Sequence, residues 1–253
     1  MSVQGRIIHA LMLREMLTRF GRENLGFFWL MGEPLILTVL IIILWNLTRD
    51  HEEGQLTVSA FALTGYTLLT LWRHIISRSL FCFRQNAGLM YHRNVNYVDT
   101  LVARALLEIG GTGLSFLTAY VPLYLFGYVP PISDPLLVIG GWLFMGWISF
   151  GVGLILAGLS EVSEIAERFV QPLLYVTLPL TGVFYMVAWL PDRAQRVVLY
   201  APLVHAMEML REGVAGSSVE TTWSFSYLVN SCLVLTGVGL LTIKKTRKYV
   251  RLE

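Results

Sequence analysis

Six long apolar stretches divide this chain, and they restrict its fold more than any other feature. A helix needs about 20 mostly apolar residues to cross the hydrocarbon core of a bilayer. By that criterion we predict six membrane-spanning helices, at residues 27–47, 56–80, 101–126, 136–159, 169–189 and 225–243. Because lipid cannot hydrogen-bond to exposed backbone groups, the predicted fold is an all-α integral membrane protein.

The composition agrees with this assignment. Charged residues make up only 14% of the chain, whereas about 25% is usual in a soluble domain. The polar connections are too short to hold a separate core, so we expect one transmembrane domain over residues 1–253. A net charge of +2 is too small to indicate a nucleic-acid partner. Cys82 and Cys232 have no metal-binding spacing, and we interpret both as apolar filler.

Residues 1–25 differ from the stretches that follow. Apolar residues recur at helical spacing from Ile8 to Phe20, and basic residues occupy much of the remaining surface. This pattern is typical of a helix that lies in a membrane interface, although a soluble helix that buries one face is the alternative. Glu33, before Pro34 in the first span, is expected to pair with an arginine. The charged residues that we expect to matter here are Arg14, Arg19, Arg22 and Glu33.

Positive charge predicts the orientation in the membrane. Lysine and arginine concentrate in residues 1–25, in the tail at 244–253, and in the loops after the second and fourth spans. Basic residues are fewer on the opposite face, where we count Arg49, Arg193, Arg196 and Arg211. Since cytoplasmic loops carry the excess of lysine and arginine, we expect both termini in the cytoplasm.

The second span contains a cluster of ionisable residues near its cytoplasmic end. Such residues are costly in the membrane and therefore indicate a functional site. Arginine binds carboxylates and phosphates through its planar fork, so the cluster predicts contact with an anionic substrate. Alternatively, both arginines reach out to the interface, and the aromatic residues form belts there. The predicted substrate pathway comprises Tyr66, Trp72, Arg73, His74, Arg78, Tyr175 and Tyr185.

Three patterns in the later spans predict how helices pack. Arg104 and Glu108 are spaced to pair on one helix face. Pro172 and Pro179 are expected to bend the fifth span. The fourth span is rich in glycine, which lets helices approach closely in lipid. Its glycines are Gly140, Gly141, Gly146, Gly151, Gly153 and Gly158.

The long outer connection, residues 190–223, contains the segment VVLYAPLVHAMEMLREGVAG at 197–216. This segment is too apolar for an ordinary loop and too short to span the membrane. We therefore predict a re-entrant or interfacial hairpin before the last span. Glu208, Arg211 and Glu212 are expected to form a local network within it.

Two polar loops face the cytoplasm. The loop FCFRQNAGLMYHRNVNYVDT, residues 81–100, mixes both charges with aromatic residues and is long enough for a short helix that a cytosolic partner contacts. A solvated connector is the alternative. The loop after the fourth span carries Glu161, Glu164 and Glu167 along one side of a short helix.

The chain has no P-loop, no HExxH and no GxSxG motif. We therefore expect a transport subunit rather than an enzyme, with no catalytic residue, no metal and no cofactor bound by this chain. Energy for uphill transport must then come from an ion gradient or from a partner. A membrane-embedded transferase or a secondary transporter is the more distant alternative.

Several segments resemble the ABC-2 type permease family, in particular its KpsM-type capsule permeases. They are LREMLTRFGRENLGFFWLMGEP at 13–34, NYVDTLVARALLE at 96–108, FYMVAWLP at 184–191 and YAPLVHAMEMLREG at 200–213. The resemblance covers nearly the whole chain. It departs at Ala201, before Pro202, where asparagine is expected.

The resemblance implies a multi-pass protein of the bacterial inner membrane, a homodimer joined to two copies of an ABC ATPase subunit that binds ATP and Mg²⁺. Its substrate would be a lipid-linked anionic polysaccharide, passed from cytoplasm to periplasm. A periplasmic polysaccharide co-polymerase and an outer-membrane export protein are implied as further partners. Export of O-antigen or teichoic acid is the nearest alternative, and export of small molecules or drugs by the same fold is another.

The resemblance also implies residue roles. The region from Arg84 to Asp99 corresponds to the part of the family that docks on the ATPase, with residues 160–168 as a second contact. The expected ATPase-coupling residues are Arg84, Asn86, Tyr91, Arg93, Asn94, Asp99 and Glu164.

Overall fold

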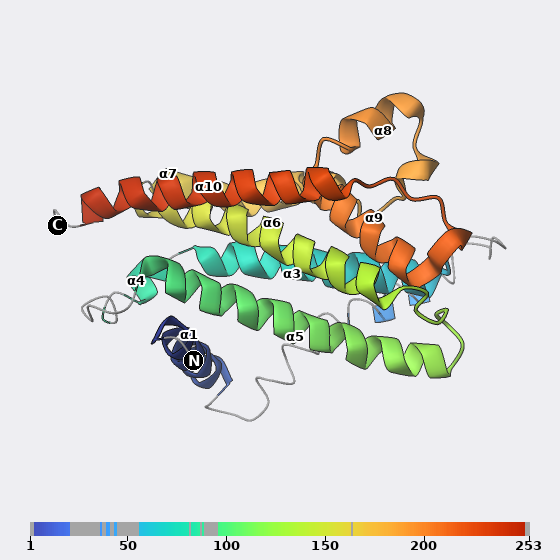
Figure 1. Cartoon of the computed structure of the whole chain (residues 1–253), viewed down its shortest axis with the longest axis horizontal. Helices are drawn as coiled ribbons and strands as arrows, with labels where there is room; N and C mark the ends of the chain where they lie inside the picture. The colour runs from blue at the N-terminus through green and yellow to red at the C-terminus, as the bar shows by residue number, and fades with distance from the viewer. Residues whose placement is uncertain are drawn as a thin grey trace.

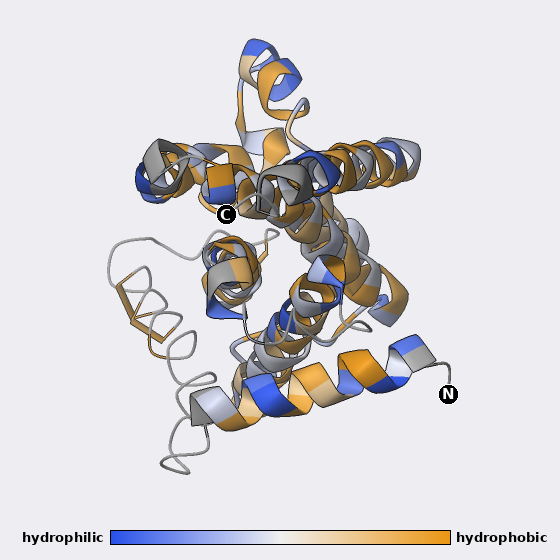
Figure 2. Cartoon of the chain, turned by 90° about the vertical axis from the view of Figure 1, so that its left-hand side faces the viewer, coloured by the Kyte–Doolittle hydropathy of each residue, from blue (hydrophilic) through white to orange (hydrophobic). Residues whose placement is uncertain are grey.

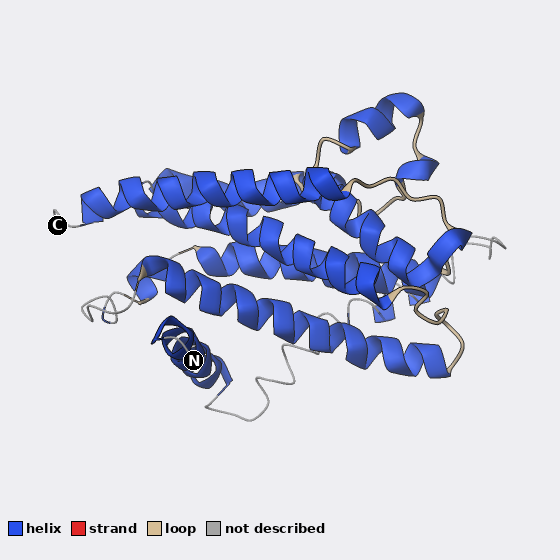
Figure 3. Cartoon of the chain, in the orientation of Figure 1, coloured by secondary structure: helices blue, strands red, loops and turns tan. Residues whose placement is uncertain are grey.

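The computed structural model describes residues 3–20, 56–80, 82–86, 88, 96–162 and 164–250, with positions 36, 39–40 and 43–44. Within these residues, helices and loops make up the whole structure (Figure 3). Most of the predicted first span, 27–47, lies outside the described residues, as do Arg22, Glu33, Tyr91, Arg93 and Asn94. Of Arg19, Arg84 and Glu164 only the backbone is described, within helices given below.

Four long helices form the body of the molecule: α3 (Val58–Ser79), α5 (Tyr97–Leu125), α6 (Pro135–Val162) and α10 (Phe225–Val250). They run along its long axis (Figure 1). Three of them, α5, α6 and α10, are long and apolar enough to cross a membrane. Their positions agree with the predicted third, fourth and sixth spans, although α10 continues through most of the predicted tail.

Helix α3 corresponds to the predicted second span and is the most enclosed of the four. Most of its residues are buried against other helices. Because protein covers it, α3 tolerates polar residues that a lipid-facing helix would not. The hydroxyls of Thr64 and Thr67 donate to carbonyls one turn earlier in the helix, at Ala60 and Leu63, and so remain satisfied without water.

The predicted fifth span, 169–189, is not one continuous helix: the α-helix ends before Pro179, one of the two prolines that were expected to bend it. Helix α7 (Glu164–Val176) is followed by two short 3₁₀ turns, η2 (Leu178–Thr181) and η3 (Val187–Trp189). Pro179 cannot donate the backbone hydrogen bond that a continuing α-helix requires. Gly182 then adopts a left-handed conformation with φ of 74°, which glycine does easily, and the chain turns.

The outer connection forms α8 (Asp192–Val198), α9 (Pro202–Ala215) and the turn η4 (Gly216–Ser218). Helix α8 projects to the side of the bundle, while α9 lies beside α6 (Figure 1). Nearly every residue of α9 is buried. The apolar character of α9 is therefore explained by its packing inside the bundle, whereas Val197 and Tyr200 before it are exposed.

The glycines of α6 allow close packing, as predicted. A Cβ atom added at Gly141 would lie 2.7 Å from the carbonyl oxygen of Ala206 in α9. One added at Gly151 would lie 2.8 Å from the Cβ of Leu235 in α10. Backbones at such contacts approach so closely that a larger residue would force them apart.

Helix α1 (Val3–Phe20) lies across one end of the bundle. Figure 1 views it nearly along its axis, and Figure 2, turned by 90°, shows it lengthwise. The short helix α4 (Cys82–Gln85) and the C-terminal end of α10 lie at the same end. We refer to it as the α1 end. The predicted helix in residues 1–25 is present, and its crosswise direction is the one expected of an interfacial helix.

Candidate functional site

At the α1 end, side chains of α1, α4 and α5 form a polar junction. Its first contact is at the start of α5, where Asn96 and Asp99 form a capping box: the backbone amide of Asn96 donates to the Asp99 carboxylate at 3.0 Å. The second oxygen of that carboxylate accepts a hydrogen bond from the side-chain amide of Gln4 in α1. Asp99 thus caps the N-terminus of α5 and binds α1 at the same time.

The second contact joins α1 to the residue after α4. Arg14 donates from Nη1 to Oδ1 of Asn86 at 2.8 Å. The amide of Asn86 donates in turn to the Cys82 carbonyl at 2.7 Å, which fixes the side chain. Burial raises the pKa of the neighbouring Cys82 thiol, so this group stays protonated and uncharged, in agreement with its expected role as filler.

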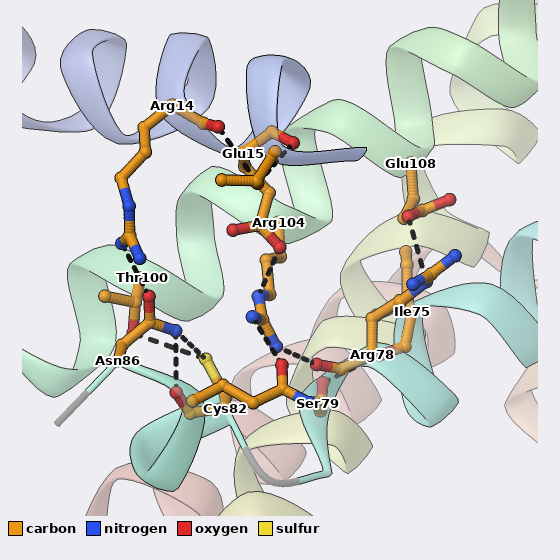
Figure 4. A network of polar contacts seen from close by, with 12 residues as sticks. Arg14, Glu15, Ile75, Arg78, Ser79, Cys82, Asn86, Thr100, Arg104 and Glu108 are labelled. Atoms are coloured by element: carbon orange, nitrogen blue, oxygen red, sulfur yellow. Dashed lines mark hydrogen bonds and ion pairs between the residues drawn. The ribbon is translucent and has the colours of Figure 1, made fainter. Parts of the chain in front are cut away.

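The third contact is made by the guanidinium of Arg104 (Figure 4). Its Nε lies 2.9 Å from Oε1 of Glu15 in α1. Its Nη1 donates to the carbonyl of Arg78 at the end of α3, and its Nη2 to Oε1 of Gln85 in α4, both at 2.8 Å. The planar fork of arginine suits this arrangement, because its donors point in several fixed directions. One side chain of α5 therefore binds α1, α3 and α4.

The predicted pairing of Arg104 with Glu108 is wrong. Arg104 is directed to α1 and α4, whereas Glu108 is directed to α3. Nδ1 of His74 lies 3.2 Å from Oε2 of Glu108, and Nε of Arg78 lies 3.9 Å from its Oε1. The Glu108 side chain is only 1% exposed, so its charge is shielded from water and neutralises part of the positive charge of α3.

The structure separates the predicted substrate pathway into several parts. His74 and Arg78 meet at Glu108, as above. The guanidinium of Arg73 lies 5.8 Å from the ring centroid of Tyr175 in α7, and Tyr175 is 61% exposed. Among the predicted pathway residues that the structure describes, Arg73 and Tyr175 thus pair a cation with an exposed aromatic ring.

The remaining predicted aromatic residues have structural contacts. Trp72 is buried in the core. Tyr66 packs edge-on against Phe184, with ring centroids 6.5 Å apart. The hydroxyl of Tyr185 donates to the Pro179 carbonyl at 2.7 Å.

A second polar network surrounds α9, as predicted, and it reaches further than expected. Arg211 is fully buried. Its Nη1 donates to the carbonyls of Gly182 at 2.8 Å and Tyr185 at 2.7 Å, and its Nη2 to that of Val183 at 3.2 Å. The guanidinium also lies 4.0 Å from the ring centroid of Phe61 in α3. Arg211 thereby holds the turn after α7 against α3.

Acidic residues complete the network around α9. Glu208 accepts hydrogen bonds from the backbone amides of Val187 at 3.3 Å and Thr222 at 3.2 Å. Glu212 accepts from the hydroxyl of Thr221 at 2.6 Å and from the indole of Trp223. The carboxylates thus fix the segments on both sides of the outer connection.

Sequence reasoning missed Gln4, Glu15 and Gln85, the partners that complete the junction at the α1 end. One signal was available, because Glu15 is the single acidic residue of α1. An isolated acid in a basic helix indicates a specific partner. Its partner Arg104 lies far along the chain, and spacing alone does not identify it.

Comparisons with known proteins place these features in a family. The model of the ABC-2 type transporter family matches residues 6–214. The chain is 36% identical over 250 residues to the capsule polysaccharide export inner-membrane protein BexB of Haemophilus influenzae. It is 37% identical over 250 residues to the protein of the same description, CtrC, of Neisseria meningitidis serogroup B. Each alignment covers 99% of this chain and 94% of the relative.

A more distant relative is the polysialic acid transport protein KpsM of Escherichia coli, 27% identical over 255 residues, or 98% of this chain and 95% of the relative. The family match includes the junction residues of α4 and α5 and the charged residues of α9, Glu208, Arg211 and Glu212. The chain therefore belongs to the ABC-2 type transporter family.

Proposed function

We propose that this chain is the permease subunit of an ATP-driven exporter that moves lipid-linked capsular polysaccharide from the cytoplasm to the periplasm. The observation that carries the proposal is identity of 35–37% to inner-membrane proteins named for capsule polysaccharide export, over nearly the full length of the chain. Export of O-antigen or teichoic acid is the alternative within the same class, and drug export by the same fold is a more distant one.

The proposed topology has six membrane crossings, with both termini in the cytoplasm. The position of α1, α4 and the C-terminal end of α10 at one end of the bundle supports it (Figure 1). In this topology α7 and the turns after it make the fifth crossing, and α9 is the re-entrant part of the outer hairpin. With 14 residues, α9 is about 21 Å long, too short for a hydrocarbon core of about 30 Å.

The working unit in this proposal is a homodimer with two copies of an ABC ATPase subunit in the bacterial inner membrane. ATP and Mg²⁺ bind to the ATPase. A periplasmic polysaccharide co-polymerase and an outer-membrane export protein continue the path. The ATPase contacts the region 84–99 and Glu164 of each permease. Within this region, Asn86 and Asp99 are already bonded to α1. We therefore assign the direct contact with the ATPase to Tyr91, Arg93 and Asn94.

Charge reversal at Arg93 tests the ATPase contact. Arg93→Glu is expected to uncouple ATP hydrolysis from export while the permease remains in the membrane, because a repelled loop no longer follows the ATPase. Export is measured as surface polymer, and membrane content by immunoblot. Unchanged export would contradict this assignment.

The substrate pathway in this proposal begins at Arg73 and Tyr175. The arginine fork suits the anionic group of a lipid-linked sugar, and an exposed ring offers a face on which sugar rings stack. Stacking tolerates many sugars, so a polymer can move along such a surface without being held at one register. In this proposal Arg78 and His74, which lie beside Glu108, also belong to the substrate pathway.

Deletion of the gene, with complementation by this chain, tests the proposed function. We expect polymer to accumulate inside the deletion strain, and mass spectrometry to find a lipid at its terminus. Complementation should return the polymer to the surface. Normal surface capsule in the deletion strain would overturn the proposal, and accumulation of O-antigen or teichoic acid instead would select the alternative. Inspection of the neighbouring genes gives a further test: an ATPase gene within a cluster for sugar-polymer synthesis would support the same conclusion.

A further inference from the structure

The proposed ATPase-coupling region, residues 84–99, is bonded to α1 near both of its ends, which we call its stems. The stem at Asn86 accepts a hydrogen bond from Arg14 of α1, and the stem at Asp99 accepts one from Gln4 of α1. Gln4 and Arg14 are ten residues apart, which corresponds to about 15 Å along a helix. Helix α1 therefore bridges the two stems of this loop, and neither stem can move far without moving α1 or breaking a hydrogen bond.

Next to the Arg14 contact, Glu15 of α1 forms an ion pair with Arg104 of α5. The side chain of Arg104 is 9% exposed and that of Glu15 is 14% exposed. When a largely buried ion pair loses one partner, a charge is left without compensation, so such a pair resists separation. Arg104 also binds the end of α3 and Gln85 of α4. A displacement of the stem at Asn86 thus reaches α5 through α1 and this guanidinium, whereas the stem at Asp99 belongs to α5 itself (Figure 4).

Membrane anchoring alone does not explain these contacts. Leu13 and Leu17, which are 47% and 69% exposed, point away from the bundle and are available to lipid. An anchor requires only such an apolar surface. The side chains that face the bundle include Arg14 and Glu15, whose partners lie in the loop stem and in α5. The two surfaces of α1 therefore have separate roles.

We propose that α1 is a brace that ties the stem at Asn86 to the stem at Asp99 and transmits movement of the Asn86 stem to α5 and the end of α3 through the Glu15–Arg104 pair. This inference rests on the proposed function, since it requires a separate ATPase that moves the loop. Gln4, Arg14, Glu15 and Arg104 are positioning residues in this role. None of them needs to contact substrate or ATP.

The test uses the full complex of permease and ATPase, in cells and in proteoliposomes. Glu15→Gln removes the charge of the pair and keeps the shape of the side chain. We expect export to fall about tenfold, within the range typical of coupling between two sites, while ATP hydrolysis stays within about twofold of wild type. The matched control is Glu220→Gln, the same change at an exposed carboxylate of the outer connection, which should alter neither activity.

A double-mutant cycle with Arg104→Gln decides whether the two residues act together. If they do, the double variant exports no less than Arg104→Gln alone, because the pair is already broken. Additive losses would overturn the proposal. Should Arg104→Gln not accumulate in the membrane, Arg104→Lys, which keeps the charge and loses the fork, takes its place in the cycle. Arg14→Gln against the exposed Arg6→Gln provides an independent comparison on α1.

The outcomes separate the brace from the proposed function. Absence of export by the wild-type complex would contradict the function itself. If wild type exports and Glu15→Gln also exports normally, the brace is wrong. If export, ATP hydrolysis and the amount of assembled complex fall together, α1 is a structural anchor and the brace is again wrong. Loss of export with ATP hydrolysis retained is the result that supports it.

Discussion

Arg104 and Arg211 each connect several helices, but with different kinds of partner. Arg211 donates to three backbone carbonyls of the turn after α7 and is fully buried. Arg104 binds one carbonyl and two side chains, Glu15 and Gln85, and retains slight exposure. A carbonyl cannot move without its backbone, whereas a side chain can rotate. The comparison indicates a rigid support around α9 and an adjustable joint at the α1 end.

This difference agrees with the work proposed for the two regions. The joint at the α1 end adjoins the loop that an ATPase would move, so its contacts must follow that displacement and transmit it without breaking. The network around α9 holds a chain that has left regular helix after Val176. Between the two 3₁₀ turns, the carbonyls of Gly182, Val183 and Tyr185 lie outside any helix, and Arg211 donates to them.

The largest expected effect comes from replacing Arg211. Arg211→Met leaves three buried carbonyls without their donor and the Glu208 carboxylate without the positive charge 4.0 Å away, at a cost of about 3–5 kcal/mol. We expect a strong loss of folded protein and a lower midpoint of thermal unfolding in detergent. The matched control is Arg193→Met on the exposed helix α8. If Arg211→Met and Arg193→Met were equally stable, the network around α9 would not be a rigid support and the comparison with the α1 end would fail.

A substitution at Gly141 tests whether the support is rigid. The added methyl group of Gly141→Ala meets the Ala206 carbonyl at 2.7 Å and Leu210 at 2.8 Å. If α6 and α9 cannot separate, the cost is about 1–3 kcal/mol, measured by thermal unfolding. Gly110→Ala is the control, because nothing lies within 4 Å of its added Cβ atom. A neutral Gly141→Ala would show that α9 has freedom to shift.

Replacing Arg104 is expected to affect stability less and transport more. Arg104→Met removes the partner of Glu15, Gln85 and the Arg78 carbonyl, but the two side chains can turn toward water, so we expect a cost of about 1–2 kcal/mol, smaller than for Arg211→Met. Thermal unfolding and export are measured on the same preparations as Arg211→Met. If Arg104→Met destabilises as strongly as Arg211→Met, the α1 end is a support of the same kind and the comparison fails.

The smallest effect on stability is expected for Arg73 and Arg78 replaced together. Arg73→Ala with Arg78→Ala should change the free energy of unfolding by about 0.5–1 kcal/mol, because neither arginine is fully buried. We expect polymer to remain inside the cells, since the guide for its anionic group is lost. The readout is surface against intracellular polymer. Normal surface polymer would indicate that both side chains only reach to the membrane interface.

Much of the fold was predictable from the sequence. Apolar stretches and their lengths located α3, α5, α6 and α10 to within a few residues. The glycines of the fourth span predicted its close contacts. These properties depend on composition and local spacing, which a linear sequence displays directly.

The candidate site was predictable only in part. Asn86, Asp99 and Arg14 were expected to matter, but their convergence on one junction was not. The fifth span was located by hydropathy, and Pro172 and Pro179 were expected only to bend it; the α-helix instead ends at Val176, and the chain turns at Gly182. Arg104 and Glu108 were paired by spacing, yet each has partners on other helices.

The sequence by itself determined that this protein is a helical membrane protein of the ABC-2 type, because apolar length and recognisable segments are local properties. The tertiary structure alone decided which charges meet. Glu15 and Arg104 stand 89 positions apart in the chain and 2.9 Å apart in the fold. The angle at which α1 crosses the bundle brings them together, and that angle is set by the packing of α1 against α5.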